Sequence, residues 1–374
     1  MRSARKTGKQ QVAIMGTRGI PAKHGGFETF AEQLSLYLKH RGWQVTVYCQ
    51  AEGRGPISED AWQGMVRVHV PVALKGAKGT VLFDWLSTKD VIKKKMPALI
   101  FGYNTAVFSV LYRMAGVPNI INMDGIEWRR GKYNFLERSW LFINEKLGLL
   151  LGNHLIADHP EIKRHLAQFI GSRKITTIPY EGKIITNADP AYLDELGLTP
   201  GGYALLVARP DPENSILEIV RAYSKKQRGL PLVVLGRYFP KANPYHKKIM
   251  DAAGQEIRFA GAIYRRPMLQ ALRFHSRFHI HGHTVGGTNP SLVEALGAGS
   301  AVLARNNRFN RWVAGEGALY FSSQAECQRE ISRLIRDDGL IQEMKISGRK
   351  HYLKRFNCQR VLDAYEKILL QNGF

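Results

Sequence analysis

Short runs of β-branched and aliphatic residues alternate with amphipathic segments along the chain, and this alternation restricts the possible folds more than any other feature. In the first half, strands are expected at 11–15, 44–48, 66–70, 98–101, 119–122, 154–157 and 174–178, and helices at 27–41, 105–114, 135–151 and 160–170. Strand–helix alternation of this kind implies a parallel sheet that is covered on both faces. The first half therefore predicts a doubly wound α/β domain.

The alternation stops near residue 180 and restarts at 203. Strands are then expected at 203–208, 232–235, 257–260, 278–281, 300–304 and 318–321, and helices at 214–225, 267–274, 290–296 and from 324 to the end. Two Rossmann-like α/β domains facing a cleft are predicted. Their expected bounds are a disordered basic tail at 1–10, an N-terminal domain at 11–182, a linker at 183–202, a C-terminal domain at 203–350, and a C-terminal helix at 351–374 that returns to the first domain.

The charge of the chain restricts its partners more than its fold. Fifty-four Lys and Arg residues against 31 Asp and Glu residues give a formal net charge of +23. Such a surface attracts nucleic acid, anionic lipid or phosphorylated small molecules, or serves solubility alone. Because no nucleic-acid-binding motif is recognised, no nucleic-acid partner is expected. A non-enzymatic nucleic-acid-binding protein stays as an alternative on charge alone.

The cysteines and the longest apolar runs bear on location. Cys49, Cys327 and Cys358 form neither a CxxC nor a metal-ligand pattern. This fits a reducing cytoplasm, with no metal site and no cofactor expected. No run reaches the 18 or so apolar residues that a spanning helix needs. A cytoplasmic protein is predicted, with any membrane contact peripheral.

A glycine-rich loop follows the first expected strand. Its sequence is GTRGIPAKHGGFETF, residues 16–30, with Arg18 and His24 among its basic side chains, and Glu28 one turn after Gly25 and Gly26. A strand, a glycine-rich turn and a helix form an anion-binding arrangement, because backbone N–H groups and the positive helix end face the ligand. The pattern is neither GxGxxG nor a P-loop. A tight turn with solvated charges is the alternative.

A second such loop occurs in the C-terminal half, after the expected strand 278–281. Thr288 or Asn289 can cap a helix that has Pro290 at its first position. The N–H groups of Ser291 and Leu292 would then be free to bind a diphosphate. Glu294, one turn further along, can accept hydrogen bonds from ribose hydroxyls, as acidic residues do in other nucleotide-binding folds.

A third polar loop, NMDGIEWRRGKYN at 122–134, follows an expected strand of the first domain. Asp124, Glu127, Trp128 and Arg129 gather in it and are candidates for acceptor recognition or sugar contact. An ion-paired loop with an anchoring Trp is the alternative. Tyr264, after another strand, is a weaker candidate for stacking on a nucleotide base.

The segment GTRGIPAKHGGFETFAEQLS resembles the opening signature of a rhamnosyltransferase-like branch of glycosyltransferase family 4, which has the GT-B fold and a retaining mechanism. The general family form is GxP…GG…E, which Gly19, Pro21, Gly25, Gly26 and Glu28 match. The resemblance spans most of the chain. It implies that this loop lies near the donor phosphates and the acceptor, so that Arg18, Gly25 and Gly26 are expected to bind the donor and His24 the acceptor.

The same resemblance shows where this chain departs from the family. The family places two carboxylates across the second loop. The second is Glu294, whereas the first position is Gly286, so His281, His283 or the backbone of Gly286 and Gly287 would substitute. In ARPDPENS, residues 208–215, the family's diphosphate-binding Arg is Arg209, but its Lys position is Asn214, which can donate only a neutral hydrogen bond. Arg209 therefore carries more of the leaving-group stabilisation.

The resemblance implies a retaining transfer of a hexosyl or 6-deoxyhexosyl group, with rhamnose as one candidate, from a nucleotide-diphosphate sugar. The acceptor would be a saccharide or a polyprenyl-diphosphate-linked saccharide in surface polysaccharide biosynthesis. Arg209 would stabilise charge on the leaving phosphate, and Glu28 and Asp124 are the candidates for a catalytic base. A nucleotide-sugar epimerase or hydrolase of the same fold is the alternative enzyme.

Basic and apolar residues lie near one another in the first domain. The basic stretches are 91–95, 129–132 and 163–164, and the apolar ones are 140–142 and 147–151. Together they suggest a peripheral contact with an anionic surface, at the inner face of the cell membrane. The alternative is that 147–151 belongs to the core.

Overall fold

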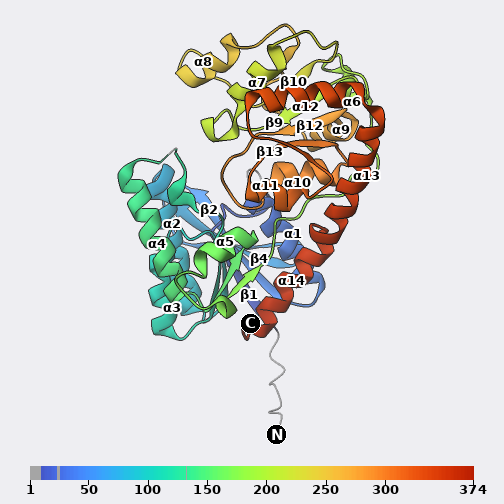
Figure 1. Ribbon diagram of the computed structural model, residues 1–374. Coiled ribbons are helices and arrows are strands. Elements are labelled where there is room, and N and C mark those ends of the chain that lie inside the picture. The colour runs from blue at the N-terminus through green and yellow to red at the C-terminus, as the bar shows by residue number, and fades with distance from the viewer. Residues whose placement is uncertain (1–9, 23–25, 132) are drawn as a thin grey trace. The chain divides into compact units, whose positions relative to one another are not determined.

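The computed structural model describes residues 10–22, 26–131 and 133–374 and divides into two compact units (Figure 1). Unit 1 contains the chain up to Ile178 and the last segment, Val361–Phe374, and unit 2 contains Pro179–Arg360. The boundary precedes the expected linker at 183–202. Leu193 and Leu198 of that segment are buried in the core of unit 2, so the segment is part of a domain rather than a connection.

Unit 1 is built on an eight-stranded sheet with the order β3-β4-β2-β1-β5-β6-β7-β8. The strands are β1 (Gln11–Met15), β2 (Gln44–Glu52), β3 (Ser58–Trp62), β4 (Met65–Val72), β5 (Ala98–Phe101), β6 (Asn119–Asn122), β7 (His154–Ala157) and β8 (Ile175–Thr177). Neighbouring strands are parallel except for β3, which pairs antiparallel with β4. Every residue of β6 is buried, as expected for a strand that has helices on both faces.

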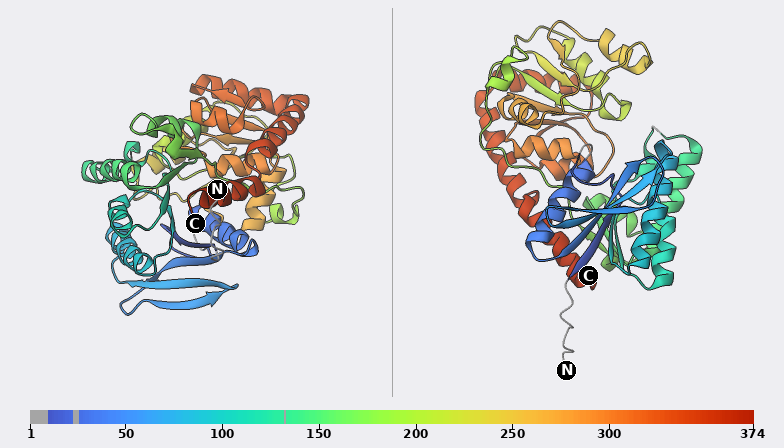
Figure 2. Two further views of the ribbon diagram at one scale, coloured as in Figure 1. Left: turned by 90° about the horizontal axis from the view of Figure 1, so that it is seen from below. Right: turned by 180° about the vertical axis from the view of Figure 1, so that it is seen from behind.

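Helices cover both faces of this sheet (Figure 2). On one face, Phe83 of α2 and Tyr112 of α3 pack with Met15 and Tyr48. On the other, the ring of Phe30 in α1 lies 4.9 Å from that of Tyr365 in α14. The helices of this unit are α1 (Gly26–His40), α2 (Gly76–Lys93), α3 (Ser109–Ala115), α4 (Phe135–Leu151), α5 (Pro160–Leu166) and α14 (Cys358–Gln371), which reaches unit 1 from Val361 onward.

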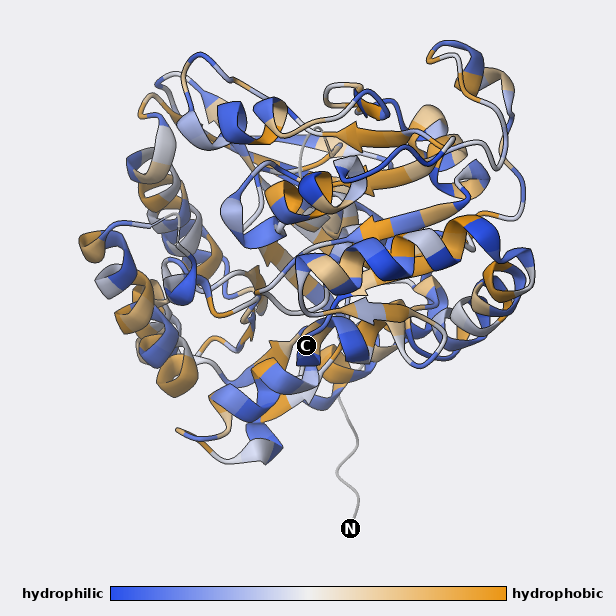
Figure 3. Cartoon of the chain, turned by 45° about the horizontal axis from the view of Figure 1, so that its top comes forward, coloured by the Kyte–Doolittle hydropathy of each residue, from blue (hydrophilic) through white to orange (hydrophobic). Residues whose placement is uncertain are grey.

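Unit 2 has a six-stranded, fully parallel sheet with the order β11-β10-β9-β12-β13-β14. The strands are β9 (Ala204–Val207), β10 (Leu232–Leu235), β11 (Ile257–Phe259), β12 (Phe278–His281), β13 (Val302–Arg305) and β14 (Leu319–Phe321). The helices are α6 (Ala191–Asp194), α7 (Ile216–Ser224), α8 (Pro244–Asp251), α9 (Arg266–His275), α10 (Pro290–Gly297), α11 (Arg308–Ala314), α12 (Gln324–Arg336) and α13 (Asp338–Arg355). In Figure 3 the strands are mostly hydrophobic, which agrees with their burial.

Both sheets have a point where the order of strands reverses. In unit 1 the reversal lies between β1 and β5, and in unit 2 it lies between β9 and β12. In open α/β sheets, ligands bind outside the carboxyl ends of the strands at such a point. The loops after β1, β9 and β12 are therefore the positions at which a ligand is expected.

The predicted fold class, two Rossmann-like α/β domains with C-terminal helices, is confirmed. The strand β3 and the helices α2, α6, α8 and α11 were not expected. The buried positions of α2 include Gly79, Asp84 and Ser87, so its apolar periodicity is weak. Four of the five residues of β3 are exposed, and this strand lacks the alternation that identifies a half-buried strand. No helix in the described part of the chain has the length and hydropathy of a membrane span.

Candidate functional site

The loop after β1 requires glycine at two positions. A Cβ atom on Gly16, whose φ is +79°, would lie 2.1 Å from the carbonyl oxygen of Phe101. A Cβ atom on Gly19, whose φ is +110°, would lie 2.8 Å from the Cα atom of Cys49. Both glycines therefore allow the loop to lie directly against β5 and β2.

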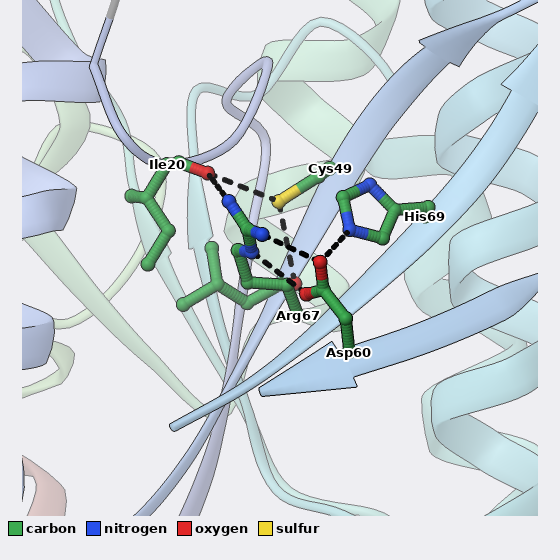
Figure 4. Close-up of polar contacts among 6 residues, drawn as sticks. Ile20, Cys49, Asp60, Arg67 and His69 are labelled. Atoms are coloured by element: carbon green, nitrogen blue, oxygen red, sulfur yellow. Dashed lines mark hydrogen bonds and ion pairs between the residues drawn. The ribbon is translucent and has the colours of Figure 1, made fainter. Parts of the chain in front are cut away.

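The backbone of Ile20, the next residue of this loop, is held by Cys49 of β2 and Arg67 of β4 (Figure 4). Arg67 Nη1 donates to the carbonyl oxygen of Ile20 at 3.3 Å, and its Nε donates to Asp60 Oδ1 at 2.8 Å. The Arg67 guanidinium lowers the pKa of Asp60 to about 2, and His69 also contacts this carboxylate. The loop backbone is thus fixed, while the side chain of Arg18 is exposed to solvent.

The predicted residues that follow lie at the start of α1. His24 and Gly25 fall outside the described residues. Gly26 is the first residue of α1, and Glu28 lies in its first turn with a partly buried side chain. A carboxylate at this position is stabilised by the positive end of the helix dipole.

Asp124 is positioned by a hydrogen-bonded chain that runs to the C-terminal helix. Its N–H donates to Asn122 Oδ1 at 3.0 Å, and Asn122 Nδ2 donates to the hydroxyl of Tyr365 at 2.7 Å. Asp124 has a φ of 50°, a left-handed conformation that is uncommon outside glycine. Neither Asn122 nor Tyr365 was predicted to matter. Asn122 could have been found as the last polar residue of a buried strand, whereas no sequence signal places Tyr365 beside it.

The segment Glu127–Arg129, labelled η2, is fixed by interactions with the rest of unit 1. Glu127 accepts from Arg130 Nη1 at 3.0 Å and from the hydroxyl of Tyr133 at 3.2 Å. Trp128 Nε1 donates to the buried Glu145 at 3.0 Å, and Arg129 stacks on the Trp128 ring. For Glu127 and Trp128 the arrangement matches the alternative of an ion-paired loop with an anchoring Trp.

In unit 2, Arg209 follows β9 at the reversal point. Its side chain is 66% exposed, and its contact with Asp211 is long, at 3.7 Å. Asn214 differs from expectation. This residue is buried, and its Nδ2 donates to the carbonyl oxygen of Arg209 at 2.7 Å. Asn214 therefore holds the backbone of the Arg209 loop through one of its two amide hydrogens.

The loop after β12, residues 282–289, is held at several points. Thr284 donates to the carbonyl oxygen of Glu213 through both its N–H and its hydroxyl, each at 2.9 Å. The carbonyl oxygen of His283 accepts from Asn307 and from Asn310, each at 2.8 Å. Gly286 has a φ of +121°, and within the described residues the amides of Gly286 and Gly287 form no hydrogen bond. Two unoccupied donors thus lie in a loop that is otherwise fixed.

The start of α10 corrects a second prediction. Asn289 caps this helix and accepts from the N–H of Ser291 at 3.0 Å, and the N–H of Leu292 donates to the carbonyl oxygen of Asn289 at 3.1 Å. These amides are therefore engaged rather than free. The reason is that an Asn cap satisfies the first N–H groups itself, so capping and ligand binding compete for the same donors.

Glu294 lies one turn further along α10 and forms an ion pair with Arg273 of α9. Arg273 Nη2 lies 2.5 Å from Glu294 Oε2, and the Arg273 side chain is buried whereas that of Glu294 is partly exposed. This pairing leaves Glu294 Oε1 available. Arg273 was not predicted, although its place as a basic residue near the end of an amphipathic helix was visible in the sequence.

Three histidines stack along β12 and the start of the loop after it. The rings of His281 and His283 are nearly parallel, with centroids 4.4 Å apart, and His279 lies behind His281. Burial lowers the pKa of His281 to about 3, so this side chain is neutral at physiological pH. Its Nε2 atom is buried and has no hydrogen-bond partner. An imidazole in this state can donate or accept one hydrogen bond without adding charge.

The other predicted site residue of unit 2, Tyr264, is exposed in the loop after β11. In the described residues, no group of three or more His, Cys, Asp or Glu side chains could hold a metal ion. The predicted residues lie after strands in both units. In unit 1, Arg18 follows β1, Glu28 lies in the first turn of α1 and Asp124 follows β6. In unit 2, Arg209 follows β9, His281 ends β12, and His283 lies in the loop after it.

Two family models match parts of the chain. Residues 9–183 match a model described as a domain of unknown function (DUF1972), and residues 215–367 match one described as Glycosyl transferase-like. A comparison with curated proteins finds no match.

Solved structures with a similar fold cover nearly the whole chain. Sucrose-phosphate synthase from Thermosynechococcus elongatus has a TM-score of 0.79 at 14% identity, with 97% of this chain and 99% of that one covered. Anabaena HepE in complex with UDP and glucose has a TM-score of 0.75 at 15% identity, with 97% and 100% covered. An α,α-trehalose-phosphate synthase (UDP-forming) from Burkholderia vietnamiensis has a TM-score of 0.71 at 11% identity, with 97% and 100% covered. The chain therefore has the GT-B fold of two Rossmann-like domains, and most of its second unit matches the Glycosyl transferase-like family model.

Proposed function

We propose that the protein is a glycosyltransferase that moves a hexosyl or 6-deoxyhexosyl group from a nucleotide-diphosphate sugar to an acceptor hydroxyl. One observation carries the proposal: an exposed Arg209 and a rigid, glycine-containing loop follow the adjacent strands β9 and β12 at the reversal point of the unit 2 sheet. This is the position at which α/β sheets bind nucleotides. The match of residues 215–367 to the Glycosyl transferase-like model supports the same activity.

Arg209 is assigned to the donor diphosphate. A guanidinium is always charged and can bind two phosphate oxygens at once. Its weak contact with Asp211 leaves most of this capacity available. The amides of Gly286 and Gly287 would add neutral donors to the same group, at a backbone that a ligand can approach closely.

The ribose and the sugar are assigned to the neighbouring side chains. Glu294 Oε1 would accept from a ribose hydroxyl, because Arg273 already holds the other oxygen. His283, which is partly exposed and stacks on the buried, neutral His281, would contact the transferred sugar in place of the carboxylate that family members carry at the position of Gly286. A neutral group there leaves the positive charge of an oxocarbenium-like transition state to be balanced by the donor phosphates.

The residues of unit 1 are assigned to the acceptor and to proton transfer. Arg18 and Gly26 remain candidates for contact with the donor, and Arg129 for contact with the acceptor. Glu28 or Asp124 would accept the acceptor's proton, with the leaving phosphate as a further possible base. Arg209 and the loop amides would stabilise charge as it grows on that phosphate. We propose retention of anomeric configuration, which rests on the resemblance of the sequence motifs to a retaining family.

The finer assignment also rests on that resemblance. We propose rhamnose from a dTDP donor as the first sugar to test. The proposed acceptor is a saccharide or a polyprenyl-diphosphate-linked saccharide of surface polysaccharide synthesis, met at the inner face of the cell membrane. The UDP complex of Anabaena HepE makes UDP-sugars the second donor class to test.

The test is a panel of UDP-, GDP- and dTDP-sugars incubated with the full chain and a membrane lipid extract, with products resolved by mass spectrometry. A sugar transferred to a lipid or saccharide is the expected product. Free sugar alone, or an epimerised donor, would show the hydrolase or epimerase of the same fold instead. Salt-sensitive oligonucleotide binding with no response to any nucleotide-sugar would replace the enzyme with a nucleic-acid-binding protein.

A further inference from the structure

Unit 1 exposes several large apolar side chains on the neighbouring helices α2, α3 and α4. We define the α2–α4 face by Trp85 of α2, Met114 of α3, and Leu136, Trp140, Ile143 and Leu150 of α4. Met114, Leu136 and Leu150 are 79%, 77% and 63% exposed. Isolated exposed apolar residues are ordinary, but contiguous patches mark interaction surfaces.

The face results from the sequence of α4. Leu136, Trp140, Ile143 and Leu150 recur at helical spacing along one side of the helix. The opposite side supplies the core, where Leu141 and Leu149 are buried. Helix α4 therefore has a second apolar stripe on its solvent side, which the packing of unit 1 leaves exposed.

A groove lies between α2 and α4 on this face. Its volume is about 780 Å³, and Leu74, Trp85, Phe108, Leu136 and Trp140 are among the residues that line it. The rings of Trp85 and Phe108 lie 5.2 Å apart, and Trp140 Nε1 donates to the carbonyl oxygen of Asn104 at 2.8 Å. Both tryptophans are therefore held in place while their rings stay partly exposed.

Basic side chains surround the face. Lys78 lines the groove, Lys89 lies over the Trp85 ring, and Lys93 and Lys95 are exposed at the end of α2 and just beyond it. Of the acidic groups on these helices, Asp84 and Glu145 are buried and Asp90 is paired with Lys94, whereas Glu137 is exposed and lines the groove. The face therefore presents apolar groups within a net positive border.

We propose that the α2–α4 face docks on an anionic lipid bilayer, with its apolar side chains inserted at the headgroup boundary and its lysines on the anionic headgroups. Aromatic and aliphatic side chains bordered by lysines are the composition that binds at such an interface. The net charge of +23 supplies long-range attraction to the same surface. This inference deepens the proposed function, since it names the surface on which a lipid-linked acceptor would be met.

The test is flotation of the full chain with vesicles of 30% phosphatidylglycerol in phosphatidylcholine, and with vesicles of phosphatidylcholine alone. The variant Leu136→Gln/Ile143→Gln removes apolar groups from an exposed stripe, so folding is not affected. Its matched control is Ile346→Gln/Leu353→Gln on α13 of unit 2, where both side chains are also exposed. The apolar variant should lose at least about tenfold in binding to anionic vesicles, and the control should bind as the wild type does.

The charge is tested separately with Lys78→Gln/Lys89→Gln, for which Lys226→Gln/Lys241→Gln is the control. Each lysine near an anionic surface contributes roughly 1 kcal/mol, so the double variant should bind about tenfold or more weakly. Equal binding to neutral vesicles, or unchanged binding by either face variant, would overturn the proposal. A concentration-dependent dimer that Leu136→Gln/Ile143→Gln dissociates, without vesicle binding by the wild type, would make the face a contact between copies instead.

Nucleotide titration of the same variants separates this inference from the proposed function. Face variants that lose vesicle binding should keep wild-type nucleotide affinity, because none of the substituted residues is among those assigned to the nucleotide. If the protein binds anionic vesicles but no nucleotide, the proposal of membrane docking is supported and the glycosyltransferase assignment is contradicted.

Discussion

At the scale of single residues, burial decides which groups of the candidate site carry charge. His281 is kept neutral by burial, with its pKa lowered to about 3. Glu294 is fixed by a buried Arg273, which leaves one oxygen for a ligand. Arg209 has no comparable partner and stays exposed. An exposed cation, a carboxylate with one oxygen available and a buried neutral imidazole are therefore among the polar groups of the candidate site in unit 2.

The orientation of Glu294 leads to a prediction that distinguishes its binding of the ribose from any effect on binding of the phosphates. Glu294→Gln should weaken the binding of a nucleoside diphosphate about 10–100-fold, because a hydrogen bond to a charged group contributes about 1.5–3 kcal/mol. Inorganic pyrophosphate, which has no ribose, should bind the variant as it binds the wild type. Isothermal titration of both ligands measures this.

The control for that experiment is Glu195→Gln. Glu195 also forms an ion pair within unit 2, with Arg265, but the Arg265 side chain is far less buried than that of Arg273. Equal losses for nucleotide and pyrophosphate in Glu294→Gln would contradict the ribose assignment. They would point to a general loss of structure around Arg273.

Asp84 provides a test of burial that is independent of the ligand. Burial raises the pKa of this carboxyl to about 6, and Thr105 donates a hydrogen bond to it. The folded state therefore holds the proton more tightly than the unfolded state does, so this contribution to the free energy of unfolding falls as pH rises from about 4 to 6. Asp84→Asn should match the wild type near pH 4 and exceed it by about 1–3 kcal/mol near pH 8.

Chemical denaturation of wild type and Asp84→Asn across that pH range gives the two curves. Thr105→Val, which removes the donor and keeps the carboxyl, should increase the pH dependence rather than abolish it. A difference between wild type and Asp84→Asn that does not change with pH would show that Asp84 is not buried as described.

At the scale of elements, strand ends and loops were far easier to predict than the bonds that fix them. Arg209, Gly286 and Glu294 could be placed from the sequence because each follows or flanks an apolar run. The burial of Asn214 could not be predicted from the sequence, because it depends on a three-residue 3-10 turn, Pro212–Asn214, which has no periodicity. The capping of α10 was foreseen, but its consequence for the amides of Ser291 and Leu292 was not.

The close packing of the 282–289 loop predicts a large effect of one methyl group. A Cβ atom on Gly282 would lie 2.1 Å from the carbonyl oxygen of Asn214. Gly282→Ala should therefore displace the loop, lower the free energy of unfolding by about 1–3 kcal/mol and weaken nucleotide binding. Urea denaturation and nucleotide titration check the two effects.

Gly339→Ala in α13 is the matched control, because its Cβ atom would meet only Asp337 Oδ1, at 3.5 Å. It should raise the free energy of unfolding by about 0.5–1 kcal/mol and leave nucleotide affinity unchanged. Wild-type nucleotide binding by Gly282→Ala would mean that the loop does not contact the ligand.

At the scale of the whole molecule, the fold was predictable because strand–helix alternation repeats in both halves of the chain. The boundary between the two units was harder to predict. Residues 183–202 have little periodicity, yet Leu193 packs in the core of unit 2. Solved structures share the fold at 11–15% identity, so the fold is kept while most side chains differ. Function must therefore be tested at the strand ends rather than inferred from the fold.

The most direct test of the central claim is a calorimetric titration of UDP, GDP and dTDP and their sugars into the full chain, into Arg209→Ala and into Arg329→Ala. Arg329 is an exposed arginine of α12 in unit 2 and serves as the control. Micromolar binding of one nucleotide class by wild type and Arg329→Ala is predicted, with at least tenfold weaker binding and about 10²–10³-fold slower transfer for Arg209→Ala. Binding of none of these ligands, or equal binding by wild type and Arg209→Ala, would contradict the claim.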